Sequence, residues 1–400
     1  MLIGLIGKAN VGKSTFFNAS TNLSVHTANY PFTTINPNLG VTHVRVNCVC
    51  REFEVQDNPN NSMCIDGIRF IPVKIIDVAG LVPGAHLGKG LGNKFLDDSR
   101  QADGLIHVVD ISGSTDFEGR FIDPGNGDPL EDIKFVEEEF DLWFFSIINK
   151  DWNKTVKDLE TRNLKIEDVL YKKMSGLAVP EQLIIETLME LGLKGKRPDE
   201  WTHDEILNFA KKIRKKSKPL IIAANKSDLH SSEENIKKIR EKGYQIVPCA
   251  SEAEVVLRRA STKGLLFYLP GDSDFKIKNE ESLNLQQRHA LELIKQYLKK
   301  YGTTGIQEII NKICFDVLKT IVVYPVEDDI KLSDKKGNVL PHALLVNKGT
   351  TAKVLATMIH ADLGNGFLYA IDVRTNQRLG AEHVLNNNDV IKIVSTTRRG

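Results

Sequence analysis

The sequence predicts an α/β protein with a doubly wound, mostly parallel sheet, an inserted α-helical domain and a small C-terminal module of strands and one helix. Three observations lead to this fold class. Short apolar runs alternate with helix-compatible segments before position 119 and after position 217, as in parallel sheets covered by helices. Between them, apolar residues recur at three- and four-residue spacing. From position 320 the pattern changes to strand, strand, helix, strand, strand.

Composition limits the classes of function. A length of 400 residues suggests two or three domains, and the net charge of +1 gives no overall field that would favour nucleic acid. Five scattered cysteines do not suit a disulfide scaffold, which indicates a reducing compartment. The N-terminus lacks signal-peptide features, and no apolar run approaches the roughly 20 residues that span a bilayer. We therefore expect a cytoplasmic, monomeric protein that does not contact membranes.

The first element is a short apolar strand followed by GKANVGKS, which matches G-x-x-x-x-G-K-[ST] in full. The two glycines let the backbone curl so that its N–H groups face phosphates. Lys13 is expected to reach the β- and γ-phosphates, and the Ser14 hydroxyl to bind Mg²⁺. The predicted nucleotide-binding residues of this loop are Gly7, Ala9, Asn10, Val11, Gly12, Lys13, Ser14 and Thr15.

The next candidate groups surround the strand FIPVKIIDVAG. Asp77, at its end, is expected to hold Mg²⁺ as a Walker-B acid does. The Gly80 N–H is expected to sense the γ-phosphate. Thr34, in the preceding segment ANYPFTTINPNLG, is the candidate for a threonine that binds Mg²⁺ only when the γ-phosphate is present, and Thr33 is the alternative.

Base selection is predicted at PLIIAANKSD, which matches N-K-x-D with Asn225, Lys226 and Asp228. The Asp228 carboxylate accepts two hydrogen bonds from guanine, and adenine lacks these donors, so a site built for them rejects ATP. The following strand, YQIVPCASEAE, is expected to supply a backbone N–H to the guanine O6 from either Ala250 or Ser251.

The domain organisation follows from these motifs. The boundaries predicted are 1–118 and 217–319 for a discontinuous nucleotide domain, 119–216 for the inserted helical domain, and 320–400 for the C-terminal module. Structureless loops as long as the insertion are uncommon, which favours helices there. The strands expected in the nucleotide domain are 2–7, 40–47, 70–77, 104–110, 219–225 and 244–250. An irregular segment is expected at 262–290, and a closing helix at 303–319.

The ordered motifs YPFTT, DVAGLVPGAHLGKGLGNKFL and NKSD closely resemble the Obg-like GTPases, and the long insertion and C-terminal module resemble the YchF-related branch. The resemblance covers nearly the whole chain, and the glycine-rich switch II spacing is its most specific part. It implies a P-loop GTPase domain, Mg²⁺ and a C-terminal TGS domain, a ubiquitin-like β-grasp fold. The helix GTTAKVLATMIH of that domain is expected to be N-capped at Thr350 or Thr351.

The resemblance also bears on ligand and partner. TGS modules accompany proteins that handle tRNA or ribosomes, which implies one of these partners. Members of the YchF subfamily proper have a degraded base motif and prefer ATP. This sequence keeps Asn225, Lys226 and Asp228, which predicts GTP and GDP as ligands and a sister group of that subfamily.

Many GTPases carry a water-orienting glutamine after the switch II glycine, but here the residue is Leu81. Asn10 resembles the P-loop asparagine with which several GTPases bind K⁺, and the alternative is that it only shapes the loop. A docking partner that orders switch II is a second source of activation. His86, in the same segment, suits a surface or docking role better than catalysis.

Two further features are open to more than one explanation. The basic run KKIRKKSK at 211–218 is compatible with RNA phosphates, although a solvated helix end is the commoner explanation. Cys48, Cys50 and Cys64 lack the paired C-x₂-C spacing of common zinc sites, which favours incidental thiols in a hairpin over a metal site.

Together these features predict a GTP-binding, slowly hydrolysing molecular switch that acts with ribosomes or tRNA. The residues expected to carry hydrolysis are Lys13, Thr34, Gly80 and Asn10, and those expected to hold the metal are Ser14, Thr34 and Asp77. The alternatives are an ATP-preferring P-loop hydrolase, which the intact N-K-x-D motif disfavours, and an RNA-binding module with nucleotide as a structural ligand.

Overall fold

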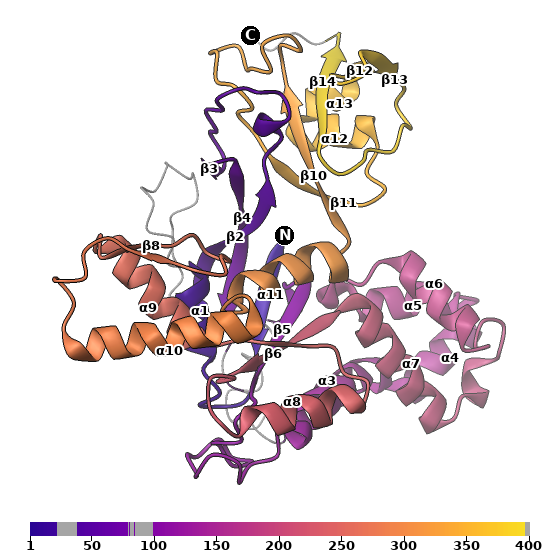
Figure 1. Cartoon of the computed structure of the whole chain (residues 1–400). Coiled ribbons are helices and arrows are strands. Elements are labelled where there is room, and N and C mark those ends of the chain that lie inside the picture. The colour runs from indigo at the N-terminus through magenta and orange to yellow at the C-terminus, as the bar shows by residue number, and fades with distance from the viewer. Residues whose placement is uncertain (22–37, 79, 81–83, 85–98, 397–400) are drawn as a thin grey trace. The chain divides into compact units, whose positions relative to one another are not determined.

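The computed structural model describes residues 1–21, 38–78, 80, 84 and 99–396 (Figure 1). Packing divides the described chain into two compact units. Unit 1 contains 1–21, 38–40 and the described residues of 74–309, and unit 2 contains 41–73 and 310–396. Each unit therefore draws on stretches that are far apart in the sequence.

The main sheet has the strand order β2-β4-β1-β5-β6-β7, with β3 paired to β4. Its strands are β1 (Leu2–Ile6), β2 (Leu39–Asn47), β3 (Met63–Ile65), β4 (Ile68–Asp77), β5 (Gly104–Asp110), β6 (Leu220–Asn225) and β7 (Ile246–Pro248). The pairs β1–β4, β1–β5, β5–β6 and β6–β7 are parallel. Every residue of β5 is buried, as expected for a parallel strand covered on both faces. The predicted doubly wound α/β fold is confirmed.

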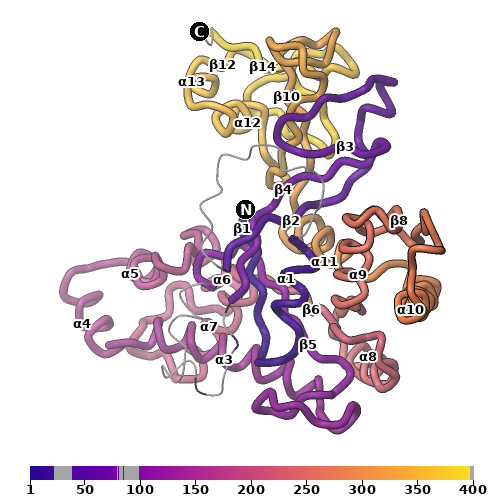
Figure 2. Tube along the Cα trace, turned by 90° about the vertical axis from the view of Figure 1, so that its left-hand side faces the viewer, coloured from indigo at the N-terminus to yellow at the C-terminus, as the bar shows by residue number. Residues whose placement is uncertain are grey.

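The helices of the nucleotide part are α1 (Lys13–Thr21), α8 (Ser232–Glu241), α9 (Ser251–Thr262), α10 (Leu285–Tyr301) and α11 (Ile306–Lys312). The inserted helices are α3 (Pro129–Asn149), α4 (Trp152–Arg162), α5 (Ile166–Lys173), α6 (Glu181–Glu190) and α7 (His203–Ser217). Figures 1 and 2 show α4 to α7 gathered together, apart from α9 and α10. Together with α3 they share a core that includes Phe144 of α3, Leu170, Ile184 and Phe209, so the predicted helical insertion is confirmed.

Local sequence sets the ends of the inserted helices. The Asp128 side chain accepts a hydrogen bond from the Leu130 N–H at 3.0 Å and thereby caps α3, whose first residue is Pro129. Both residue types suit a helix start. Thr202 and Glu205 form a reciprocal capping box at α7, which satisfies two N–H groups that the helix itself cannot.

The C-terminal part of unit 2 is a mixed sheet in the order β11-β10-β14-β12-β13. Its elements are β10 (Thr320–Val326), β11 (Leu344–Asn347), α12 (Ala352–Ile359), α13 (Ala361–Asn365), β12 (Phe367–Asp372), β13 (Gln377–Leu379) and β14 (Asp389–Ser395). Apolar residues of α12, including Leu355, pack on Val323 and Ile391 of the sheet. The Thr351 hydroxyl caps α12, which decides between the two predicted caps. The sheet has one strand more than the predicted pattern.

The segment 41–73 packs with the C-terminal sheet of unit 2. Val49 and Ile71 share a buried cluster with Val322, Tyr324 and Val390. The sequence assigns this segment to the first nucleotide-domain stretch, because β2 and β4 are strands of the main sheet. The domain boundaries at 118, 216 and 319 stay predictions.

Two expectations about elements were inaccurate. The expected helix at 303–319 is α11 followed by a π-helical turn, Ile313–Val317. The expected irregular segment at 262–290 contains the strands β8 (Leu266–Phe267) and β9 (Lys276–Ile277) and the start of α10. Asn284 and Gln287 form a capping box at α10, and this N-x-x-Q signal was available in the sequence.

No helix within the described residues is both long and apolar enough to cross a bilayer.

Candidate nucleotide-binding site

The loop between β1 and α1 depends on its two glycines. Gly7 has φ 146°, and a Cβ there would lie 2.4 Å from the Val108 carbonyl oxygen. Gly12 has φ 93°, and its Cβ would lie 2.3 Å from the Asn225 Nδ2 atom. Both conformations and both approaches exclude a side chain. The glycine pattern of the motif therefore reflects a backbone held tightly against β5 and β6.

Lys13 is the first residue of α1 and is 9% exposed. Its ammonium group donates a hydrogen bond to the Lys8 carbonyl oxygen at 2.7 Å. Burial lowers the pKa of Lys13 to about 8, although the Asp77 carboxylate opposes this shift. A Cβ on Gly80 would lie 3.4 Å from the Lys13 Nζ and from the Ala9 N. Gly80 thus lies against the phosphate loop, where the sequence predicted a γ-phosphate sensor.

Ser14 and Asp77 meet beside this lysine. The Ser14 hydroxyl donates to the Asp77 Oδ2 at 2.9 Å, and burial raises the pKa of the Asp77 carboxyl. The Asp77 Oδ1 atom is buried and has no hydrogen-bond partner among the described residues. A hydroxyl beside a carboxylate oxygen that lacks a partner is the oxygen donor set that Mg²⁺ prefers. These two residues fit a magnesium ion, whereas Thr34 and Thr33 lie outside the described residues.

On the base side, Asn225 joins the end of β6 to two other elements. Its Nδ2 donates to the Val11 carbonyl oxygen at 3.0 Å. Its Oδ1 accepts from the Ser251 N–H at 3.2 Å and from the Ser251 hydroxyl at 2.8 Å. The side chain is buried. The structure therefore brings the predicted base motif and the phosphate loop into direct contact.

The neighbouring Lys226 has φ 61° and pairs with Asp110 at the end of β5, with 2.9 Å between Nζ and Oδ2. Its Nζ also lies 3.0 Å from the Ser114 hydroxyl oxygen. Burial acts to raise the pKa of Asp110, but hydrogen bonds from Ser112, Lys226 and Ser114 lower it overall. Asp110 thus stays ionised and fixes Lys226, while Asp228 is exposed at the end of the loop.

The two candidate donors to the base O6 both have partners within the protein. The Ala250 N–H donates to the Thr304 carbonyl oxygen at 3.0 Å. The Ser251 N–H donates to Asn225, as described above. This geometry leaves the choice between Ala250 and Ser251 open.

Lys8 makes buried contacts beside the site that sequence reasoning missed. It is 3% exposed, and its Nζ lies 2.7 Å from the Asp132 Oδ2 in α3 and 2.6 Å from the Asp116 carbonyl oxygen. Another variable position, Asn10, donates from Nδ2 to the Gly119 carbonyl oxygen at 2.9 Å. Variable positions of the motif therefore tie the phosphate loop to the entrance of the helical insertion. A lysine among these positions was the available signal.

Gly84, in the segment predicted to be switch II, also contacts the helical insertion. The Gly84 N–H donates to the Glu139 Oε1 of α3 at 2.7 Å, and Glu139 is 7% exposed. Nothing in the local pattern indicated this pair, because an apolar helix face gives no information about distant partners. Leu81 and His86 lie outside the described residues.

The basic run at 211–218 uses much of its charge within the protein. Arg214 pairs with Asp141 at 2.7 Å, both buried, and Lys218 donates to the carbonyl oxygens of Arg100 and Ala102 at 2.6 and 2.8 Å. Lys212 and Lys216 form ion pairs with Glu190. Lys211 and Lys215 are exposed to solvent. The run therefore offers RNA fewer free charges than its sequence suggests.

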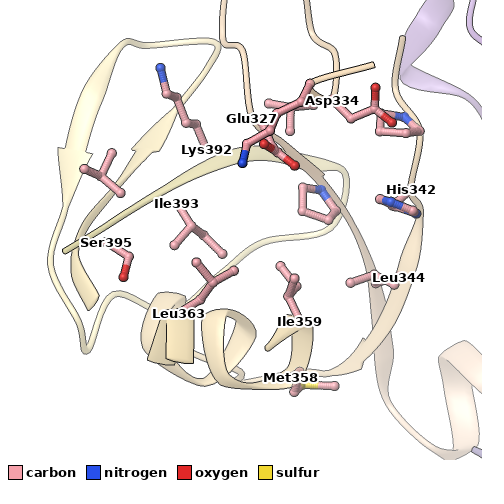
Figure 3. Close-up of a pocket in the computed structure, with 15 residues that line it drawn as sticks. Glu327, Asp334, His342, Leu344, Met358, Ile359, Leu363, Lys392, Ile393 and Ser395 are labelled. Atoms are coloured by element: carbon pink, nitrogen blue, oxygen red, sulfur yellow. The ribbon is translucent and has the colours of Figure 1, made fainter. Parts of the chain in front are cut away.

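A pocket of about 700 Å³ lies in the C-terminal module of unit 2. Figure 3 shows Ile359 and Leu363 projecting toward Ile393, with Glu327 and Asp334 on the opposite side. None of the predicted nucleotide-binding residues lines this pocket.

Three features define the GTPase class of P-loop proteins. They are a buried lysine in a glycine-rich loop at a helix start, an acidic residue at the end of a neighbouring strand, and an N-K-x-D motif. Here the asparagine of that motif is hydrogen-bonded to the glycine-rich loop and to the start of α9. Comparison with known families agrees. Residues 2–165 match the family described as 50S ribosome-binding GTPase. Residues 223–328 match the G4 motif-containing domain of the YGR210-like Obg-like GTPases, and 333–395 match the TGS domain.

Individual relatives cover the chain from end to end. The chain is 50% identical over 399 residues to the uncharacterized GTP-binding protein MJ1332 of Methanocaldococcus jannaschii, covering 99% of this chain and 100% of that protein. It is 29% identical to the ribosome-binding ATPase YchF of Bacillus subtilis, with 97% of each covered. A crystal structure of a GTP binding protein from Pyrococcus horikoshii matches with 39% identity, a TM-score of 0.79, and 99% and 100% coverage. The chain belongs to the YchF-related family of Obg-like GTPases.

Proposed function

We propose that this chain is a GTP-binding molecular switch that hydrolyses GTP slowly and acts with ribosomes or tRNA. One observation carries the nucleotide part of the proposal. Asn225, the first residue of an intact N-K-x-D motif, bonds the phosphate loop at Val11 and the start of α9 at Ser251. These contacts support a base-binding role for the N-K-x-D loop, because they hold it beside the loop 7–14.

The chain's own residues have separate roles in this proposal. Backbone N–H groups of the loop 7–14 and the Lys13 ammonium group bind the phosphates. The Gly80 N–H contacts the γ-phosphate, and Asp228 accepts hydrogen bonds from guanine. Ser14, Asp77 and Thr34 would hold Mg²⁺, which when bound neutralises charge on the phosphates. Hydrolysis is slow because Leu81 cannot orient water.

The proposal assigns activation to Asn10 with K⁺, to a docking partner, or to both. The Asn10 Nδ2 is engaged by the Gly119 carbonyl oxygen. The amide oxygen is therefore the atom of Asn10 that remains to coordinate a cation. The alternative, in which Asn10 only shapes the loop, fits its left-handed φ of 60°.

The partner is inferred from the relatives and the modules. The family matching 2–165 is described as ribosome-binding, and one relative is named a ribosome-binding ATPase. The TGS domain at 333–395 supports a ribosome or tRNA partner.

Equilibrium titration with GTP and ATP tests the nucleotide assignment. The wild-type protein is expected to bind GTP at least about tenfold more tightly than ATP, because a carboxylate that accepts two hydrogen bonds from guanine is left unpaired against adenine. Asp228→Asn is expected to weaken GTP binding and reduce this preference. Glu241→Gln, which neutralises an exposed acid at the end of α8, is the matched control. Unchanged discrimination in Asp228→Asn would exclude the proposed role of that residue.

The same titration decides the second candidate, an ATP-preferring hydrolase. This candidate is favoured by the ATPase name of the Bacillus subtilis relative. Tighter binding of ATP than GTP by the wild-type protein would replace the first proposal with this one. An RNA-binding module with a structural nucleotide would instead show RNA affinity that is equal with GTP and GDP.

A further inference from the structure

Unit 2 contains a group of side chains that the nucleotide site does not use. One ligand atom each from Cys48, Cys50, Asp57 and Cys64 lies within 4.8 Å of all the others. The Cys50 and Cys64 sulfurs are 3.8 Å apart, and the Cys48 thiol donates to the Asp57 Oδ2 at 3.2 Å. We propose that these four residues form a structural zinc site.

The spacing of the ligand atoms fits tetrahedral zinc. With Zn–S bonds of about 2.3 Å, two sulfurs of a tetrahedral site lie about 3.8 Å apart, which is the distance between Cys50 and Cys64. All three cysteines are free thiols. Three sulfur ligands and one carboxylate complete four-coordination without water, which is typical of structural rather than catalytic zinc.

The backbone around the thiols is held by hydrogen bonds. The 3₁₀ turn η1 (Val49–Arg51) follows Cys48, whose N–H donates to the Gly67 carbonyl oxygen at 2.9 Å. The Val55 N–H donates to the Cys50 carbonyl oxygen at 3.0 Å. These bonds place Cys48 and Cys50 on one short turn.

The third thiol comes from the adjacent hairpin. Cys64 lies on β3, and the β3–β4 connection consists of Asp66 and Gly67, with φ 48° and 69°. This two-residue Asp-Gly connection has the positive φ values of a tight type I′ turn. The hairpin turns the chain back toward η1, so a sequence spacing of C-x-C plus a distant cysteine becomes a compact ligand set.

Charge around the site favours a bound cation. A carboxylate and three thiolates would carry four negative charges, which a divalent cation offsets only in part. Arg69 is fully buried, and its guanidinium NH1 group lies 2.6 Å from the Asp57 Oδ2. The other terminal nitrogen donates to the Leu340 carbonyl oxygen at 2.5 Å. Arg69 therefore supplies the outer-shell hydrogen bond and charge that orient a carboxylate ligand.

The site has both access and a structural purpose. A pocket of about 440 Å³ is lined by Cys50, Asp57 and Cys64, which gives an ion a path from solvent. Cys48 and Cys50 belong to the buried cluster in which the segment 41–73 packs on the C-terminal sheet. Zinc here would hold the 48–64 excursion in the form that this packing requires.

Metal analysis of the purified full-length protein tests the proposal. We expect about one zinc per chain, retained through dialysis, and loss of that zinc in Cys48→Ser and Cys64→Ser. Cys314→Ala removes another buried cysteine of unit 2 and is expected to keep the metal. Asp57→Asn is expected to weaken zinc binding by about tenfold or more. Zinc retained by the two serine variants would place the metal elsewhere and overturn the assignment.

Cobalt replacement gives a second readout that does not depend on variants folding. Co²⁺ added to the metal-depleted wild-type protein is expected to give the visible bands of a tetrahedral thiolate site and a sulfur-to-cobalt charge-transfer band. A folded protein that binds neither Zn²⁺ nor Co²⁺, or that contains a Cys50–Cys64 disulfide by mass spectrometry, would overturn the proposal. Iron bound by the same residues in place of zinc would contradict the choice of metal.

Discussion

The Lys13 ammonium group lies buried at the start of α1, where desolvation lowers its pKa from 10.5 to about 8. Below pH 8 the charged group is buried at its full cost to stability. Between pH 8 and 10.5 the unfolded chain binds a proton that the folded chain does not, so the free energy of unfolding rises with pH in this window. A phosphate ligand would add negative charge next to the ammonium group and offset the cost of its burial.

Replacing Lys13 should therefore have opposite effects on nucleotide binding, which is lost, and on the free energy of unfolding, which rises. Lys13→Met is expected to abolish nucleotide binding while raising the unfolding free energy of the nucleotide-free protein at about pH 7 by on the order of 2–3 kcal/mol. The gain should shrink between pH 8 and 10.5. Urea unfolding at several pH values measures it, with Lys237→Met on the exposed face of α8 as control. Normal nucleotide binding by Lys13→Met would refute the phosphate-loop assignment.

Asn10 gives a second prediction for a single residue. GTP hydrolysis is expected to be faster in K⁺ than in Na⁺ at equal ionic strength, because a K⁺ ion held by the Asn10 amide oxygen would add positive charge at the phosphates. Asn10→Ala should remove the difference between the two salts. Steady-state phosphate release measures both rates, and equal wild-type rates in K⁺ and Na⁺ would leave Asn10 with a loop-shaping role only.

Among the elements, α3 connects the insertion to both sides of the phosphate site. Its Asp132 forms an ion pair with Lys8, and its Glu139 accepts a hydrogen bond from the Gly84 N–H. The buried pair of Lys8 and Asp132 has 2.7 Å between its charged atoms. Removing one partner of such a pair typically costs about 3–5 kcal/mol, since it leaves an uncompensated buried charge. The insertion is thus a structural support of the nucleotide site.

The contact of Glu139 with switch II can be tested directly. Glu139→Ala is expected to increase amide hydrogen exchange at Gly84 by about tenfold or more, because the exchanging N–H loses its acceptor. Glu138→Ala changes the exposed neighbour on the same helix and should leave Gly84 unaffected. Exchange measured by mass spectrometry on the peptide containing Gly84 gives the result. Equal exchange in both variants would show that this hydrogen bond does not protect the segment.

Sequence patterns were sufficient for elements whose neighbours are dictated by burial. The predicted bounds of the strand 104–110 are those of β5, because a short run that is apolar apart from His107 and the terminal Asp110 is typical of a buried parallel strand. The capping box of α10 was not predicted, because its residues lie in the polar segment that was expected to be irregular. The expected strand at 244–250 is longer than the observed strand β7, which is Ile246–Pro248. Strand ends are set by tertiary hydrogen bonds, such as the one that the Cys249 N–H donates to the Ala224 carbonyl oxygen at 2.9 Å.

The motifs were sufficient to identify segments that lie together: Ser14 contacts Asp77, and Asn225 contacts the loop 7–14 at Val11. The roles of these residues toward nucleotide and metal stay predictions. Lys8 and Glu139 were not predictable, because their partners are far away along the chain. The cysteine cluster was missed for a related reason: spacing along the chain does not reveal that a hairpin returns Cys64 to the turn at Cys48.

Across the full chain, a GTPase domain is combined with a helical insertion and a TGS domain. Residues 310–396 and 41–73 form one packed unit, and the helical insertion belongs to the other. The C-terminal sheet carries the pocket beside Ile359 and Leu363 (Figure 3).

Sedimentation with ribosomal subunits tests the proposed partner. The full-length protein is expected to co-sediment at least about fivefold more with a non-hydrolysable GTP analogue than with GDP, since a switch must bind its partner differently in its two states. Lys13→Met should lose this nucleotide dependence. Equal co-sedimentation in both states, or none in either, would contradict a nucleotide-dependent ribosomal switch and favour testing tRNA by the same comparison.

The hydrogen bonds of Asn225 and the ion pair of Lys226 with Asp110 have a consequence for timing. Both are contacts that the protein makes with itself. A base-binding loop held by such contacts has little conformational entropy left to lose when a purine binds. We therefore expect exchange of one nucleotide for another on the base side to be limited by dissociation of the first, and not by rebuilding of the site.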